Sequence, residues 1–195
     1  LTSIPVEPAG AFEETTAAFF APIHPHVDAG LESMIQAARK RDEFAERLQS
    51  DGRLKLPIHV TSEGTALLAD GWSPPEDWGV WNDGQEARLF LPSFRAGRWQ
   101  IKIRGRHFAD ARRSPGTPVR VAWRVGEQNP FRTESFTNGE RIQFEATVAT
   151  KASAEPRTQW LALQFPDAVY LPDAGVPDKR QVGFGLELIE IARLE

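Results

Sequence analysis

The feature that most constrains this chain is a change in hydrophobic period at Gly52. From there to the end, apolar residues recur at every second position, as in GRWQIKIRG, PVRVAWRVG, RIQFEATV and GFGLELIEI. Because successive side chains of a β-strand point to opposite faces, this alternation predicts strands with one buried and one solvated face. Together with LKLPIHV, TALLAD, ARLFL and WLALQF, the predicted strands number about eight.

Turn-forming residues separate these strands, and no helical pattern intervenes between them. The sequence therefore predicts a mainly β fold, an antiparallel jelly-roll-like β-sandwich. A chain of 195 residues is long enough to bury a core without disulfides. It contains no cysteine, which excludes disulfides, Cys-ligated metals and thiol nucleophiles.

Before Gly52 the pattern is helical. Apolar residues from Leu31 to Leu48 recur at near-helical spacing with charges opposite them, which predicts an amphipathic helix of about 20 residues that Gly52 caps. Residues 1–28 are rich in Pro, Ala and acids, and we expect an extended arm there. The predicted organisation is an arm and helix over residues 1–52, followed by a β-sandwich domain over residues 53–195.

The charge balance narrows the range of partners. The chain has a net charge of −4 and an isoelectric point near 5.7. A nucleic-acid-binding domain would carry a basic excess, so no nucleic-acid partner is predicted.

No stretch of the sequence approaches the run of about 18 apolar residues expected of a membrane helix. Because the sequence begins with Leu1, we expect it to derive from a longer protein.

The most distinctive segment is GWSPPEDWGVWNDG at residues 71–84, which holds three of the six tryptophans. Aromatic faces pair with the C–H groups of sugar rings, and carboxylates bind sugar hydroxyls. Trp78, Trp81, Glu76 and Asp83 supply this mixture and are the primary candidates for binding a saccharide. The alternative is that both tryptophans close the end of the sandwich while Glu76 pairs with an arginine such as Arg180.

Two motifs in this chain resemble a known family. The segment at residues 71–84 followed by ARLFLP, and the closing stretch LQFPDAVYLPDAGVPDKRQVGFGLELIEI, are similar to an accessory jelly-roll β-sandwich domain of unassigned function. That domain is attached to bacterial cell-surface glycosyltransferases and phosphoglycerol-transferase-like proteins. The resemblance covers about residues 65–195 and implies a bacterial polysaccharide pathway, in the cytoplasm or the cell envelope, without implying any chemistry.

Several loop residues are secondary candidates. Strand-connecting loops gather at the two ends of a sandwich, so Asn129, Arg132, Asp178 and Arg180 are expected near the tryptophan segment. No cofactor is predicted, although Asp83, Asp173 and Asp178 would offer oxygen ligands to a structural calcium ion. A basic cluster has two interpretations, a site for a phosphate or an acidic sugar, or a solvated strand edge. Its members are Arg104, Arg106, His107, Arg112 and Arg113.

No catalytic motif emerges from the sequence. A Gly-x-Ser-x-Gly elbow is absent, and nothing selects a facing pair among the 27 carboxylates. The predicted function is therefore a non-catalytic carbohydrate-binding or carbohydrate-associated accessory module of a bacterial surface-polysaccharide glycosyltransferase. The alternative is a protein-interaction domain that docks a catalytic domain of the same parent chain, and a sugar-processing enzyme ranks third.

Overall fold

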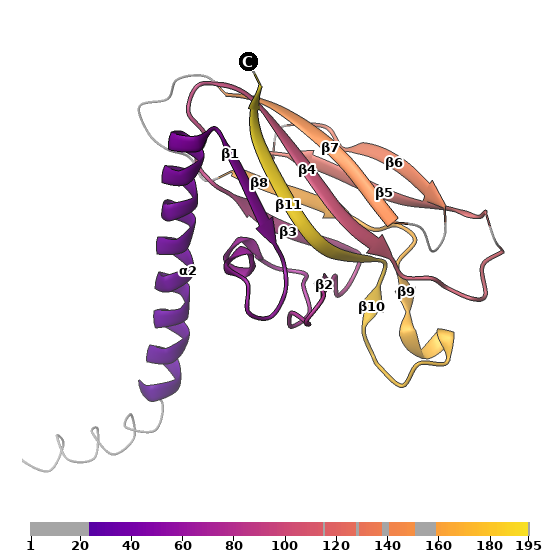
Figure 1. Ribbon diagram of the computed structural model, residues 1–195. Helices are drawn as coiled ribbons and strands as arrows, with labels where there is room; N and C mark the ends of the chain where they lie inside the picture. Colours follow the sequence, from indigo (N-terminus) through magenta and orange to yellow (C-terminus); the bar gives the residue numbers. More distant parts are fainter. Residues whose placement is uncertain (1–23, 115, 128, 138–140, 151–158, 195) are drawn as a thin grey trace, which may run out of the picture. The chain divides into compact units, whose positions relative to one another are not determined.

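The computed structural model describes residues 24–114, 116–127, 129–137, 141–150 and 159–194 (Figure 1). The chain divides into two compact units, residues 1–39 and residues 40–195. The first unit contributes the N-terminal part of a long helix, and the second contributes the rest of that helix and the strands.

The helix, α2 (His24–Asp51), confirms the amphipathic pattern but begins earlier than the sequence predicted. The prediction of an extended arm is wrong for residues 24–28, which are helical. Pro25 does not prevent this, because a proline in the first helical turn forfeits no intrahelical hydrogen bond. Residues 1–23 of the predicted arm lie outside the described part. The helix ends as expected at Gly52, whose φ of 67° suits glycine and whose N–H donates to the Leu48 carbonyl at 3.1 Å.

Four antiparallel strands form the first sheet, in the order β1 (Arg53–Pro57), β11 (Phe184–Leu194), β4 (Gly97–His107) and β7 (Arg141–Thr150). The short β2 (Val80–Trp81) also pairs with β11. Alternate residues along β4 and β7 are buried, as the period of two predicted. This sheet therefore has one face on the core and one face on solvent.

The second sheet has the order β3 (Glu86–Leu91), β8 (Gln159–Gln164), β5 (Pro118–Val125) and β6 (Arg132–Thr137). Figure 1 shows the two sheets as two layers. Side chains from both layers meet in the core, where Trp123 of β5 stacks on Phe144 of β7 with ring centroids 5.9 Å apart. The fold class is thus confirmed as a mainly β, antiparallel sandwich.

Four short elements complete the described part of the second unit. β9 (Val169–Tyr170) and β10 (Gln181–Val182) form a hairpin around the 3₁₀ turn η2 (Leu171–Ala174). The other 3₁₀ turn, η1 (Glu63–Leu67), lies between β1 and β2 in the chain.

Two strand assignments from the sequence need correction. TALLAD is not a strand, because η1 occupies its first residues and only Leu68 makes a bridge, to Leu89. Local side-chain bonds compete with the ladder here: the Thr65 hydroxyl donates to the Ser62 carbonyl at 2.9 Å. Conversely, β6 was missed because its residues are exposed or half-buried and lack a buried alternation.

Candidate functional site

A single glycine allows two tryptophans to lie against the outer face of the first sheet. Trp81 of β2 is in register with Gly185 of β11. A Cβ atom placed on Gly185 would lie 2.5 Å from Cη2 of Trp78 and 3.0 Å from Cε3 of Trp81. Since these separations are too short for carbon atoms, only glycine at this position leaves room for both indoles.

The two tryptophans are half-buried and meet edge to face, with ring centroids 4.9 Å apart and an interplanar angle of 64°. The Arg106 guanidinium lies over the Trp78 ring, 4.0 Å from its centroid, while Trp81 meets Phe108 edge-on at 6.1 Å. A T-shaped pair is a favourable arrangement of aromatic quadrupoles. The rings therefore form a corner instead of one flat platform.

Charged groups surround this corner. The Trp78 indole N–H donates to Oε2 of Glu76 at 2.7 Å. Arg180 lies 3.9 Å from Glu76 through Nη1, and its Nη2 lies 2.6 Å from Oδ2 of Asp178. The hydrogen bond from Arg180 lowers the pKa of Asp178. Asp83 is exposed and accepts a long hydrogen bond of 3.4 Å from the Gln181 amide.

One buried amide holds the segment in place, and the sequence analysis did not single it out. Asn82 is fully buried, and its Oδ1 accepts hydrogen bonds from the amides of Gly183 (2.8 Å) and Phe184 (2.6 Å). Its Nδ2 donates to the Gly84 carbonyl at 2.5 Å. The only sequence signal for this role is an Asn beside turn residues in WNDG, a pattern that equally predicts an exposed turn.

Six of the eight predicted site residues thus come together. They are Glu76, Trp78, Trp81, Asp83, Asp178 and Arg180. Asn129 and Arg132 lie elsewhere, beyond the far end of β5, where they help to line a separate cavity of about 280 Å³ with Trp123 and Thr147. There Asn129 donates to the Val125 carbonyl, and the Arg132 guanidinium lies 5.5 Å from the Trp123 ring centroid.

The calcium ligands considered from the sequence do not converge. Within the described residues, no three His, Asp or Glu side chains are grouped in a way that would hold a metal ion. Asp83, Asp173 and Asp178 therefore do not form a common ligand set.

Among the described residues, no helix is both long and apolar enough to span a membrane.

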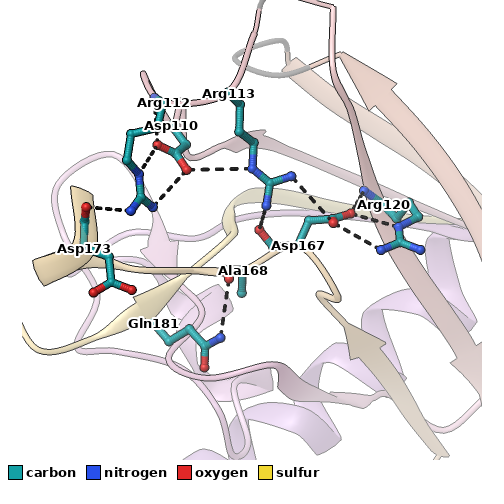
Figure 2. A network of polar contacts seen from close by, with 8 residues as sticks. All are labelled: Asp110, Arg112, Arg113, Arg120, Asp167, Ala168, Asp173 and Gln181. Atoms are coloured by element: carbon teal, nitrogen blue, oxygen red, sulfur yellow. Dashed lines mark hydrogen bonds and ion pairs between the residues drawn. The ribbon is translucent and has the colours of Figure 1, made fainter.

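The basic cluster divides into two parts. Figure 2 shows the part that lies in an ion-pair network with carboxylates. Arg112 binds the buried Asp110 through Nε at 3.0 Å and Nη2 at 3.1 Å. Arg120 binds Asp167 in the same two-pronged way, at 3.0 and 3.2 Å. Arg113 lies between the two acids, 3.8 Å from Asp110 and 3.6 Å from Asp167.

This network neutralises Arg112 and Arg113 internally. Hydrogen bonds from Arg112 hold the pKa of Asp110 below its ordinary value, and those from Arg120 do the same for Asp167. Arg112 also donates to the Asp173 carbonyl at 2.6 Å, which ties the loop after β4 to η2. The network therefore fastens loops to one another, whereas Arg104 and Arg106 belong to the outer face of the first sheet.

No family model matches the sequence, and no curated protein matches it. The resemblance to the accessory domain of cell-surface glycosyltransferases therefore stays a prediction. Several solved structures align with this chain at low similarity. The CBM36-1 domain of a multidomain xylanase from the hindgut metagenome of Trinervitermes trinervoides aligns with 73% of this chain and 98% of its own, at 12% identity and a TM-score of 0.43.

Two further structures are similar at the same level. The CBM22-1 xylan-binding domain of Paenibacillus barcinonensis Xyn10C aligns over 73% of this chain and 94% of its own, at 9% identity and a TM-score of 0.45. The C-terminal CBM6 of LamC from Zobellia galactanivorans aligns over 72% and 99%, at 16% identity and a TM-score of 0.37.

Proposed function

We propose that this chain is a non-catalytic carbohydrate-binding accessory module whose saccharide site is the corner formed by Trp78 and Trp81. The observation that carries this proposal is the gathering of four charged side chains around that half-buried pair. They come from segments about 100 positions apart in the sequence, yet Glu76 binds the Trp78 indole, Arg180 lies beside Glu76 and pairs with Asp178, and Asp83 accepts from the residue after Arg180.

The chemistry of the corner suits a sugar. An indole face attracts the weakly positive C–H groups of a pyranose, and the second ring, set at an angle, provides a wall beside it. Glu76, Asp83 and Asp178 accept hydrogen bonds from hydroxyls, and Arg180 donates them. Asn129 and Arg132 line their own cavity and constitute a secondary candidate site.

We place the module in a bacterial surface-polysaccharide glycosyltransferase. This part of the proposal rests on the resemblance of residues 71–84 and of the closing stretch to the accessory domains of such enzymes. In that setting the module would hold the polymer while a separate catalytic domain extends it.

The first test is a glycan-array screen of the chain with and without calcium, followed by titration of the best ligand against Trp78→Ala and Trp81→Ala. Removing a stacking ring is expected to cost about 2 kcal/mol of binding free energy, roughly a thirtyfold loss of affinity. Trp160→Ala is the matched control, because Trp160 is also half-buried but packs on Phe90 of the second sheet. The proposal is wrong if both site variants fold and bind like the wild type, or if the wild type binds no glycan.

A second candidate function is supported by the helix. Among the described residues of the first unit, Leu31, Met34 and Ile35 are 55%, 70% and 44% exposed, which leaves an apolar stripe in solvent. The stripe fits the docking of a catalytic domain of the same parent chain. A photo-crosslinking residue in place of Met34 in the full-length parent should link to that catalytic domain. Crosslinks only to the sandwich or to none of the parent would exclude this function.

A further inference from the structure

Positive charge is concentrated on the outer face of the first sheet. Burial alternates along β1, β4, β7 and β11, so every second side chain points to solvent. Three of the described outward side chains are acidic, namely Glu145, Glu187 and Glu190. Seven are basic: Arg53, Lys55, Arg98, Lys102, Arg104, Arg106 and Arg141. The outward side chains of these four strands thus carry four excess positive charges, on a chain whose net charge is −4.

The acids on this face do not neutralise the bases. Glu190 pairs with Lys55 at 3.2 Å and with Arg104 at 2.8 Å, while Glu145 pairs with Lys102 at 2.8 Å. Glu187 accepts from Nε of Arg106 at 2.6 Å. Within the described residues, the three other cations on this face, Arg53, Arg98 and Arg141, make no ion pair.

A groove of about 480 Å³ opens at the β1 side of this face. Its volume lies in the range of about 300–1,000 Å³ that is usual for small-molecule sites. Leu54, Ile191 and Ala192 line part of it. Its charged and polar lining comes from the end of α2 and from three strands: Arg47, Asp51, Arg53, Lys55, Gln100, Lys102 and Glu190.

We infer that this face binds an acidic saccharide, with a carboxylate or phosphate group held in the groove by Arg53 and the lysines beside it. The inference rests on the proposed function and names the substrate class of the same surface. The aromatic corner stands at the other end of this face, since Gly185 and Ala192 both lie on β11. Seven residues of strand span roughly 20 Å, so a chain of several sugars reaches from Trp81 to the groove.

The pattern of charges favours a saccharide over a nucleic acid. Duplex DNA carries one negative charge per about 1.7 Å, and such a dense array would meet repulsion from Glu145, Glu187 and Glu190. A saccharide with one anionic group per repeat places hydroxyls between its charges. Those hydroxyls donate to the three acids, while the anionic groups pair with guanidinium groups in two-pronged fashion.

Calorimetric titration of the 195-residue chain with matched polymers tests the inference. Polygalacturonate is compared with its methyl ester, and a phosphomannan with the same mannan after dephosphorylation, so that each pair differs only in charge. We expect the charged member to bind at least tenfold more tightly, and its affinity to fall as salt is added. The pair with the larger ratio of charged to neutral affinity identifies the carboxylate or the phosphate as the preferred anionic group.

Substitutions on the outer face of the first sheet test whether the preference for charged polymers arises there. The double change Arg53→Gln and Arg141→Gln removes two cations that have no ion pair among the described residues, and it should weaken binding of the charged polymer by about tenfold. Arg88→Gln is the control for charge, because Arg88 is exposed on β3 of the other sheet and should leave affinity unchanged.

The outcomes separate this inference from the function on which it rests. Equal affinity for charged and neutral polymers, with binding still lost in Trp81→Ala, overturns the acidic class and leaves the carbohydrate module standing. Wild-type affinity of the double variant for the charged polymer also overturns the acidic class and leaves the carbohydrate module standing. Equal affinity for a DNA duplex at the same salt concentration overturns the inference in favour of unspecific polyanion binding. Failure to bind any saccharide overturns both.

Discussion

At the scale of single residues, the carboxamide of Asn82 connects the tryptophan segment to the strand on which the tryptophans lie. It accepts from two amides at the start of β11 and donates back into its own turn. Because a carboxamide has both a donor and an acceptor side, it satisfies backbone groups of both segments at once. A purely hydrophobic side chain of similar size would leave these groups unpaired.

We predict that Asn82→Ala lowers the free energy of unfolding by about 2–4 kcal/mol, since the buried amides of Gly183 and Phe184 lose their shared acceptor. Denaturant titration measures this loss. Gln143→Ala is the control, because Gln143 is exposed on β7 and its removal should change stability by less than about 0.5 kcal/mol. Equal effects of the two changes would mean that the Asn82 bonds contribute nothing.

The sequence predicted some of these residues better than others. The alternation in β4 and β7 identified which side chains are buried, because that assignment depends only on neighbouring positions. The stacking of Arg106 on Trp78 and the bonds of Asn82 join positions far apart in the chain, and no local pattern encodes them. Asn129 was expected near the tryptophans because loops gather at two ends, and sequence does not say which end.

At the scale of elements, α2 is amphipathic, but its C-terminal part packs in the core while the apolar residues of its N-terminal part are exposed. In its C-terminal part, Phe44 and Leu48 are fully buried in the core of the second unit, and Arg41 donates to the Ala66 carbonyl at 3.0 Å. Arg47 also binds Glu63 of η1 at 2.6 Å, a hydrogen bond that lowers the pKa of Glu63. Hydrophobic periodicity predicted the helix, but it did not distinguish the part that packs here from the part that stays exposed.

A matched pair of leucines tests this division. Leu48→Ala should reduce the free energy of unfolding by about 3 kcal/mol, because it opens a cavity in the core. Leu31→Ala removes the same atoms from a side chain that is 55% exposed, and it should cost less than about 0.5 kcal/mol. Thermal or denaturant unfolding of the two variants provides the comparison, and similar losses would show that the exposed stripe also packs in solution.

At the scale of the whole molecule, total charge conceals how the charges are distributed. A net charge of −4 gave reason to exclude a nucleic-acid partner, yet the register of four strands places seven bases on one face. Burial would raise the pKa of Glu190, but Lys55 and Arg104 outweigh it, so this carboxyl keeps its charge between them. Composition alone does not show such segregation, because it depends on which residues share a face.

The carboxylate network of Figure 2 makes stability depend on acid. The folded pKa values of Asp110 and Asp167 lie below the unfolded value of about 3.9. Their contribution is complete above that value and disappears as the pH falls through the folded pKa values, because the unfolded chain then binds more protons. We therefore expect the free energy of unfolding to fall as the pH drops below about 4.

Asp167→Asn should lower stability at neutral pH and make the acid decline shallower, and Arg120→Gln should have the same effect because it removes the partner. Denaturant titrations between neutral pH and pH 3 measure both slopes. An unchanged acid decline in both variants would show that this ion pair does not control the acid sensitivity.

The order of strands in the first sheet also bears on how the protein is made. β11 is the last of the described strands to be synthesised, yet it lies between β4 and β1, which is the first of them. Until β11 emerges, β1 has no partner among the described strands of its sheet, and the core side chains that β11 supplies are missing. The nascent sandwich therefore carries β1 without its ladder partner through nearly its whole synthesis, and the unpaired backbone groups of that strand stay open to wrong pairing until β11 arrives.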